Sequence, residues 1–400
     1  MKNKPIPYGK QSISKKDIKA VVATLQSDFL TQGPQILKFE TTFAKYVDAK
    51  FAVAVANGTA ALHLSALALK VQPGQKVITT PITFSASANC IKYCGGDVVF
   101  ADINPDTYLF DINEVKDILS KAPKGTYAGI IPVDFAGRAV NLELLKNLAD
   151  EYGLWIIEDA CHAPGGFFID SKKQKQFCGN GNFADLAIFS FHPVKHITSG
   201  EGGMITTNRE DLYKKLLELR THGITRNKEL FLNDVATASG NASLLNSDYP
   251  GWYMEMQELG YNYRLTDFQA ALGTSQLKKA DKGLKRRREI AKKYTDAFAG
   301  KKWLKGQSGS IEGHAYHLYV IEAENRLGLY NYLKSKYIFT QVHYIPVHQM
   351  PYYKNQGYKP GDYPNAEKYY SSCLSLPMYP TLTSKEQNFV IDCINSFYNI

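Results

Sequence analysis

Short apolar runs alternate with helix-length stretches through the first part of this sequence. The runs are residues 51–56, 76–80, 98–102, 128–134 and 154–159, and two more follow at 186–191 and 204–207. This alternation predicts strands joined by helices, and therefore a mainly parallel sheet covered by helices on both faces. In such an α/β fold, ligands bind beyond the carboxyl ends of the strands. Candidate functional residues are therefore those that directly follow an apolar run.

One such residue is Lys195, in the loop between the runs 186–191 and 204–207. A lysine at the edge of a core is partly desolvated, which lowers its pKa and makes the neutral, nucleophilic amine accessible. Such an amine can condense with an aldehyde. The alternative is an ordinary solvated loop lysine.

Asp159 and His162 lie at the end of the run 154–159. A carboxylate at the end of a buried strand is costly unless it has a cationic or hydrogen-bonding partner. A protonated pyridine nitrogen would be such a partner, and the carboxylate would keep that nitrogen charged so that the ring could accept electrons. The alternative for Asp159 is a helix N-cap.

Two further sites follow strands. Gly58 and Thr59 form a tight turn before an Ala- and Leu-rich helix, where free N–H groups and the helix dipole favour a phosphate. Phe84, just beyond the run 76–80, could stack on a flat ligand. The alternatives are a helix N-cap for Thr59 and a core position for Phe84.

A nucleophilic lysine, a buried carboxylate, a phosphate site and a stacking ring are together the requirements of one ligand, pyridoxal 5′-phosphate (PLP). The sequence contains no GxGxxG, GxxxxGK[ST] or GxSxG motif. These absences argue against a dinucleotide site, a nucleoside triphosphate site and a hydrolase nucleophile elbow.

The second half of the sequence predicts a smaller lobe. Residues 220–259 are polar and predict an exposed insertion or a loop over the site. A long helix from about Asp267 to Phe298 should lead into strands at 316–321 and 341–348 and helices at 326–336 and from Ser384. We therefore expect a large domain of residues 1–266, with an N-terminal arm and a helix over 14–25, and a smaller α+β domain of residues 267–400.

Composition excludes several classes of protein. The chain has 400 residues, 44% of them hydrophobic, and a net charge of +9 that is concentrated on the long helix. A solvated helix face or a surface for an anionic substrate explains this charge better than nucleic acid does. No run of eighteen apolar residues or signal-like N-terminus occurs, so no membrane segment is expected. Six cysteines without paired spacing indicate neither a metal site nor a disulfide framework, and they favour the cytoplasm.

The sequence resembles the DegT/DnrJ/EryC1/StrS family of sugar aminotransferases, which are PLP-dependent enzymes of fold type I. The resemblance runs from Leu30 to the C-terminal helix. Six segments carry it, namely 30–34 (LTQGP), 57–62 (NGTAAL), 158–162 (EDACH), 190–195 (SFHPVK), 200–203 (GEGG) and 260–265 (GYNYRL).

The resemblance implies a role for each candidate residue. Lys195 would condense with the cofactor, Asp159 would pair with its pyridinium nitrogen, and His162 would lie beside its ring. The phosphate would be held by Gly58, Thr59 and Ser190, and the ring face would be covered by Phe84. The segment from Asn262 to Arg264 would reach the cofactor site of a neighbouring subunit, which implies a homodimer with shared active sites. Thr31 and His343 are implied sugar contacts, and Arg226 is a candidate for the diphosphate.

Other segments are similar to the transaminases of pseudaminic acid biosynthesis. They are 81–89, 133–137, 255–260 and 341–344, and Arg138 departs from the uncharged residue that is frequent in other branches. The implied substrate is UDP-2-acetamido-2,6-dideoxy-β-L-arabino-hexos-4-ulose, with L-glutamate as amino donor and 2-oxoglutarate as product. Alternatives are another keto sugar linked to GDP or dTDP with its ketone at C4 or C3, a deoxygenating relative, and a non-catalytic regulator. Deoxygenating relatives carry histidine in place of the lysine, and this chain retains Lys195.

Overall fold

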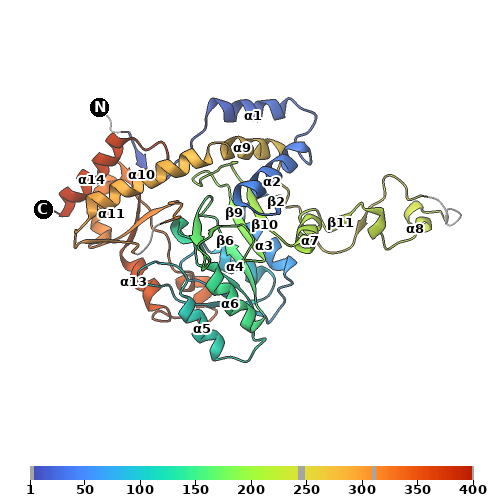
Figure 1. Cartoon of the computed structure of the whole chain (residues 1–400), viewed down its shortest axis with the longest axis horizontal. Coiled ribbons are helices and arrows are strands. Elements are labelled where there is room, and N and C mark those ends of the chain that lie inside the picture. Colours follow the sequence, from blue (N-terminus) through green and yellow to red (C-terminus); the bar gives the residue numbers. More distant parts are fainter. Residues whose placement is uncertain (1–3, 242–247, 309–311, 399–400) are drawn as a thin grey trace.

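The structure is a computed structural model that describes residues 4–241, 248–308 and 312–398. A central sheet carries most of the chain, a smaller C-terminal unit lies to one side of it, and one segment projects from the body on the other side (Figure 1). No helix within the described ranges is long and apolar enough to cross a membrane.

The central sheet has seven strands in the order β2-β10-β9-β6-β5-β3-β4. Only β10 runs antiparallel to its neighbours, which confirms the predicted mainly parallel sheet. The strands are β2 (Phe51–Val55), β3 (Lys76–Thr79), β4 (Asp97–Phe100), β5 (Tyr127–Ile131), β6 (Trp155–Asp159), β9 (Leu186–Ser190) and β10 (Gly203–Thr207). A short hairpin, β7 (Phe167–Ile169) and β8 (Lys175–Phe177), lies between β6 and β9.

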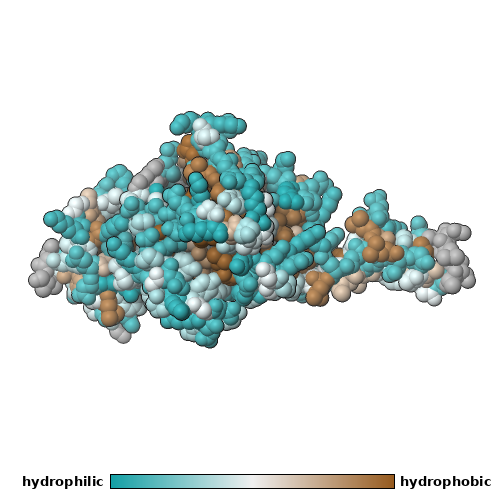
Figure 2. Space-filling model, turned by 90° about the horizontal axis from the view of Figure 1, so that it is seen from below, coloured by the Kyte–Doolittle hydropathy of each residue, from teal (hydrophilic) through white to brown (hydrophobic). Residues whose placement is uncertain are grey.

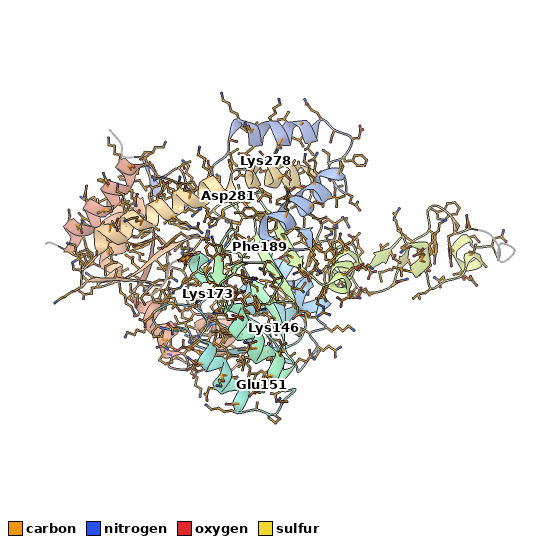
Figure 3. All side chains as sticks on the ribbon, viewed as in Figure 1. Lys146, Glu151, Lys173, Phe189, Lys278 and Asp281 are labelled. Atoms are coloured by element: carbon orange, nitrogen blue, oxygen red, sulfur yellow. The ribbon has the colours of Figure 1, made fainter. Side chains whose placement is uncertain are left out.

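Helices cover both faces of this sheet, as the alternation of apolar runs predicts. They are α2 (Pro34–Val47), α3 (Gly58–Ala68), α4 (Ala86–Tyr93), α5 (Ile112–Ser120), α6 (Leu142–Tyr152) and α7 (Glu210–Arg220). Because neighbouring strand residues point to opposite faces, Ile157 packs with the core under α3, α4 and α7, whereas Ile156 packs with the core under α5 and α6. Phe189 of β9 lies in the middle of the molecule, and Glu151 of α6 lies near its edge (Figure 3).

The N-terminal arm and first helix pack against later parts of the chain. Strand β1 (Ile6–Pro7) pairs with β15 (Ile338–Phe339), and α1 (Lys15–Leu25) packs along α9 (Asp267–Leu277). Ser14 and Asp17 form a capping box that begins α1 at the predicted place. The apolar side of α1 faces away from α9, because Ile18 and Leu25 are 55% and 54% exposed.

Most of the C-terminal unit packs around its own hydrophobic cluster. Its elements are α10 (Ala280–Phe298), β13 (Leu304–Gly306), β14 (Tyr319–Ala323), α11 (Arg326–Ser335), β15, η4 (Val347–Gln349), α12 (Pro351–Lys354), α13 (Pro364–Ser372), β16 (Cys373–Leu376) and α14 (Ser384–Tyr398). Of these, η4, α12 and α13 pack instead against the clusters of the central sheet. Strands β13, β14 and β16 form an antiparallel sheet. The division of domains between residues 266 and 267 stays a prediction.

Two predicted elements of the second half are wrong. The single helix over 267–298 is two helices, because the chain leaves helical geometry at Lys279, whose ammonium donates to Asp17 and to the carbonyl of Ser12. The strand predicted over 341–348 is only one bridge, between Gln341 and Ser375. The rest of that stretch finds partners elsewhere, for example the N–H of Val347 at the carbonyl of Pro81.

The polar stretch 220–259 does not cover the cavity of its own chain. It forms β11 (Ile224–Thr225), η2 (Lys228–Leu230), α8 (Val235–Ser239) and β12 (Glu255–Met256) and projects away from the body (Figure 1). Hydrophobic residues gather on this projection (Figure 2). Leu232, Trp252 and Leu259 are 82%, 75% and 75% exposed. The prediction of an exposed insertion is therefore confirmed, and the prediction of a loop over the site is wrong for the single chain.

Candidate active site

A cavity of about 510 Å³ lies beyond the carboxyl ends of the parallel strands. Its walls come from the start of α3, the segment after β3, the end of β6, the loop after β9 and two C-terminal segments that contribute His317, His343 and Tyr344. Eight predicted residues meet here, namely Gly58, Thr59, Phe84, Asp159, His162, Ser190, Lys195 and His343. The tertiary structure therefore gathers side chains from most of the chain around one space.

Lys195 lies in a loop that folds tightly after β9. The N–H of Lys195 donates to the carbonyl of His192 over 2.9 Å, and its side chain lines the cavity. Desolvation lowers the pKa of Lys195; nearby Cys161 and Asp159 oppose this shift, and Arg287 adds to it. A larger fraction of neutral amine is therefore available than on a solvated lysine.

Asp159 is the last residue of β6 and is 5% exposed. Its Oδ2 accepts a 2.7 Å hydrogen bond from the Ser87 hydroxyl, and its Oδ1 accepts the N–H of Cys161 over 3.2 Å. The Ser87 hydroxyl in turn lies 2.8 Å from that of Thr83. No helix begins at Asp159, so the alternative of an N-cap is wrong. Ser87 was not among the predicted site residues, although it lies in the 81–89 segment that carries part of the resemblance.

His162 is fixed at both ring nitrogens. Its Nδ1 accepts the N–H of Ala136 over 3.2 Å, which leaves the proton on Nε2, 3.1 Å from the Tyr344 hydroxyl. Desolvation, with Lys195 and His343, holds the pKa of His162 well below its ordinary value. The ring of His317 packs 4.4 Å from that of His162. Tyr344 and His317 were both missed, because a lone aromatic or histidine in a sequence is more often structural.

The start of α3 is open toward the cavity. Asn57 is its N-cap, since its Oδ1 accepts the N–H of Ala60 over 2.8 Å, so the alternative of Thr59 as the cap is wrong. The N–H groups of Gly58 and Thr59 have no acceptor within the helix. A Cβ at Gly203 would lie 2.4 Å from the carbonyl oxygen of Asn57, so only glycine lets β10 pass so close. This end of the cavity could hold an anion.

Phe84 and His343 lie on other walls of the cavity. Phe84 is 62% exposed, so the alternative of a core position is wrong. Its ring centroid lies 6.4 Å from that of Tyr344. His343 is buried with its Nδ1 2.8 Å from the Ser375 hydroxyl, and desolvation lowers its pKa to about 3.

The remaining predicted residues do not reach this cavity within one chain. Arg226 and Arg264 line a separate cavity of about 530 Å³ with Gln32 and His222. Asn262 pairs with Thr221, and Thr31 pairs with Thr266. All four lie in segments that the resemblance assigns to contacts with a neighbouring subunit or with substrate.

The basic residues of the long helix do not line the Lys195 cavity either. Lys285, Arg288 and Lys292 line a different cavity of about 750 Å³ between α10 and the hairpin of β7 and β8. Arg287 is 1% exposed and donates from one nitrogen to the carbonyls of Tyr316, His317 and Met378. Arg287 therefore ties α10 to the segment that carries His317.

Comparisons with known proteins agree with this geometry. Residues 11–395 match the sequence profile of the DegT/DnrJ/EryC1/StrS aminotransferase family. The spore coat polysaccharide biosynthesis protein SpsC of Bacillus subtilis is 39% identical over 98% of this chain and 97% of its own length. The UDP-4-amino-4,6-dideoxy-N-acetyl-beta-L-altrosamine transaminase of Campylobacter jejuni is 35% identical over the same shares of the two chains.

Solved structures are similar over nearly the whole chain. Helicobacter pylori PseC, an aminotransferase involved in the biosynthesis of pseudoaminic acid, superimposes with a TM-score of 0.84 at 28% identity, covering 99% of this chain and 100% of its own. The PLP form of the sugar aminotransferase Spr1654 from Streptococcus pneumoniae gives a TM-score of 0.85 at 27% identity, covering 99% of both chains. This chain therefore has the fold of the type I PLP-dependent transferases, and it is a sugar aminotransferase that belongs to the DegT/DnrJ/EryC1/StrS family.

Proposed function

We propose that this enzyme uses PLP to transfer an amino group from L-glutamate to C4 of UDP-2-acetamido-2,6-dideoxy-β-L-arabino-hexos-4-ulose. The observation that carries the chemistry is the meeting of Lys195, Asp159 and the open start of α3 in one cavity. The choice of sugar is supported by the similarity to the Campylobacter altrosamine transaminase and to PseC.

The residues of the cavity suit PLP. Asp159 is buried among hydrogen-bond donors, and no lysine or arginine of the described chain forms an ion pair with it, so a pyridinium nitrogen would complete its partners. The start of α3 offers N–H groups to a phosphate, with the Thr59 and Ser190 hydroxyls beside it. The cofactor would supply an electron sink next to the reacting carbon.

The protein groups would then divide the remaining work. Lys195, as a neutral amine, would bind the cofactor aldehyde and move the proton at the reacting carbon. Asp159 would hold the ring nitrogen in its charged form, and Phe84 and His162 would limit how the ring can tilt. Because His162 is held neutral, it adds no positive charge that would disfavour protonation of Lys195 or of the ring nitrogen.

We also propose a homodimer in which each active site is completed by the partner. Thr31, Arg226, Asn262 and Arg264 are the residues that would cross to the second site, with Arg226 on the diphosphate and Thr31, Arg264 and His343 near the sugar. The exposed apolar residues of α1 and of the projecting segment support this assembly, because large apolar patches mark interfaces. All six cysteines are free, which supports the cytoplasm as its compartment.

A second keto sugar is also supported by one comparison. SpsC is more similar in sequence than the altrosamine transaminase, and its name refers to a spore coat polysaccharide. Another nucleotide-linked 4-keto or 3-keto sugar would use the same lysine and carboxylate, because only the partners of the nucleotide and the sugar would differ.

The test is an absorption spectrum followed by a substrate panel. Purified enzyme should show the visible band of lysine-bound PLP, and L-glutamate should convert it to the band of pyridoxamine phosphate. UDP-, GDP- and dTDP-linked keto sugars are then added in turn, and the UDP-linked 4-keto sugar should restore the first band fastest. Lys195→Ala should give neither band conversion nor turnover. Conversion by glutamate with restoration only by a GDP sugar would retain the chemistry and overturn the proposed substrate.

A further inference from the structure

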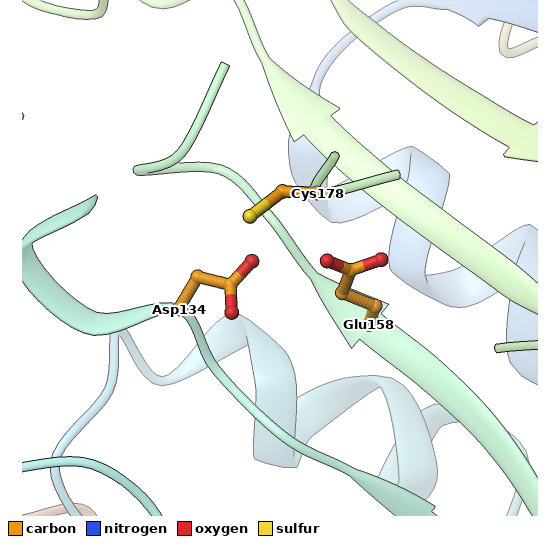
Figure 4. A group of neighbouring side chains, drawn as sticks. All are labelled: Asp134, Glu158 and Cys178. Carbon is orange, nitrogen blue, oxygen red and sulfur yellow. The ribbon is translucent and has the colours of Figure 1, made fainter. Parts of the chain in front are cut away.

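Three buried side chains meet on the side of β6 that faces away from the cavity. Asp134 follows β5, Glu158 lies on β6 and Cys178 follows β8, and they are 1%, 2% and 2% exposed. Their ligand atoms lie within 4.8 Å of one another, and the three side chains point toward one another (Figure 4). Because Glu158 and Asp159 are consecutive strand residues, Glu158 lies directly behind the proposed cofactor carboxylate.

The hydrogen bonds of this cluster leave one oxygen without a donor. Asp134 Oδ1 accepts the N–H of Val140 over 2.8 Å, and Glu158 Oε2 accepts the N–H of Gly179 over 2.9 Å. Asp134 Oδ2 is buried and accepts nothing from the described residues. One oxygen of the Asp134 carboxyl group points into the cluster, toward the Glu158 carboxyl group and the Cys178 sulfur (Figure 4). An unsatisfied buried oxygen of this kind is costly, so a donor is expected there.

Within the part of the chain that the structure describes, no basic side chain is among the groups that shift the pKa of Asp134 or Glu158. The two carboxyl groups act on each other, the Cys178 thiol lowers the pKa of both through hydrogen bonding, and Asp159, from the far side of β6, raises the pKa of Asp134. All of these are neutral or acidic. Two ionised carboxylates this close in a dry interior would repel each other strongly, whereas one proton removes the repulsion and supplies the missing donor.

We propose that Asp134 and Glu158 share one proton, donated by Glu158 to Asp134 Oδ2, and that this pair is a positioning device for the residues of the active site. Burial raises the pKa of Glu158 well above its usual range and that of Asp134 to about 6. The free oxygen of Glu158 is the site of this proton in the proposal, because a proton there supplies the donor that Asp134 Oδ2 lacks, while the other Glu158 oxygen accepts the N–H of Gly179.

The pair of Asp134 and Glu158 connects the chain segments that carry the active-site residues Asp159 and His162. The N–H of Asp134 donates to the carbonyl of Asp159 over 3.0 Å. The turn that follows Asp134 presents the N–H of Ala136 to His162. On the other side of the pair, the N–H of Gly179 donates to Glu158. The carbonyl of Gly179 accepts a 2.7 Å hydrogen bond from the Thr206 hydroxyl of β10. Loss of the shared proton would therefore disturb Asp159 and His162 together.

A metal ion is the competing occupant of the cluster. A thiol and two carboxylates are possible zinc ligands. However, one oxygen of each carboxyl group already binds a backbone N–H, and a hydrogen bond between the free oxygens satisfies the cluster without a cation. A shared proton and a metal ion can be distinguished on protein without cofactor, so this part of the test does not depend on the proposed function, whereas the effect on PLP binding does.

The decisive variant is Glu158→Gln, because an amide keeps a donor toward Asp134 and has no proton to lose. Infrared spectra of the apoprotein at pH 8 should show the carbonyl stretch of a protonated carboxylic acid in the wild type, and this band should be absent in Glu158→Gln. The variant should retain the wild-type dissociation constant for PLP. Asp134→Ala removes the shared acceptor and should weaken PLP binding about tenfold.

Three results would overturn the proposal. One is a wild-type spectrum without the acid band, and another is a band that persists unchanged in Glu158→Gln. The third is one divalent metal per chain by elemental analysis, lost in Cys178→Ala. If Asp134→Ala does not fold, Asp134→Asn replaces it. The amide introduced at position 134 donates to Glu158, so Glu158 should ionise and the acid band should disappear.

Discussion

At the scale of single residues, the protonation of each side chain in the active site is set by the residues that surround it. Desolvation lowers the pKa of Lys195, and backbone and hydroxyl donors surround Asp159. Hydrogen bonds to a charged group contribute more than those between neutral groups. The consequences of altering Asp159 and of altering its hydroxyl donor should therefore differ in size.

Asp159→Asn should slow the glutamate half-reaction by about 100-fold or more, because an amide cannot hold a protonated ring nitrogen by charge. Ser87→Ala removes one hydrogen bond and leaves the charge, so the loss should be about tenfold. Stopped-flow absorbance after mixing with L-glutamate measures both rates. Equal effects of the two substitutions would contradict the role proposed for the Asp159 charge.

At the scale of elements, one buried aspartate joins α1 to α9. Asp17 closes the capping box of α1 and is fully buried. It also accepts hydrogen bonds from Ser275 over 2.7 Å, Gln276 over 3.0 Å and Lys279 over 2.7 Å. Burial alone would raise the pKa of Asp17, but these partners, Lys279 foremost, lower it overall. A single side chain thus couples a helix cap to the break between α9 and α10.

Asp17→Ala should lower the free energy of unfolding by about 2 kcal/mol, because it leaves buried hydrogen-bond donors unsatisfied. The loss is no larger because Lys279, the charged partner, is partly solvated. Since the folded pKa of Asp17 is depressed, its contribution is complete above the ordinary aspartate pKa of about 3.9 and is lost as pH falls through the folded value. Urea unfolding at neutral and acid pH measures both effects.

The matched control lies on α10, where Lys292 and Asp296 form an exposed pair over 2.6 Å. Asp296→Ala should change the free energy of unfolding by less than about 0.5 kcal/mol. If Asp17→Ala were as mild as Asp296→Ala, the proposed coupling of α1 to α9 would not hold.

At the scale of the whole molecule, the predicted site residues fall into two groups. Eight of them line the Lys195 cavity, whereas Thr31, Arg226, Asn262 and Arg264 lie apart from it. The projecting segment also carries exposed apolar residues that this chain does not cover. A twofold assembly that brings the second group to the partner's cavity would resolve both features.

Mixing two inactive variants tests this arrangement. Lys195→Ala and Asn262→Ala chains, co-expressed with different tags and purified as a mixed dimer, should regain turnover. One of the two sites would then have an intact Lys195 from one chain and an intact Asn262 from the other.

Lys195→Ala mixed with Asp159→Asn is the control, because both residues line one cavity within a chain and neither site would be complete. Turnover in the control, or none in the test pair, would contradict shared active sites.

The parts of the fold that depend on local pattern could be predicted from the amino-acid sequence. Strand and helix periodicity predicted the parallel sheet, because strands buried on both faces need unbroken apolar runs, whereas the helices that cover them need an apolar stripe on one side. The helix N-cap at Ser14 could also be predicted from the sequence. Lys195, Asp159, His162 and Gly58 could be singled out because each lies where a predicted strand ends, and the resemblance to a known family joined them.

Tertiary contacts decided the rest. Ser87, Tyr344 and His317 reach the site through partners far away in sequence, which no local pattern encodes. Lys279, where the helix breaks, is bonded to Asp17 and to Ser12, which lie far away in sequence. Of residues 341–348, His343 and Tyr344 reach the cavity wall, and backbone groups of this stretch pair with Ser375 and Pro81. The carboxyl pair of Asp134 and Glu158 likewise exists only because two strand ends bring the two groups together away from water.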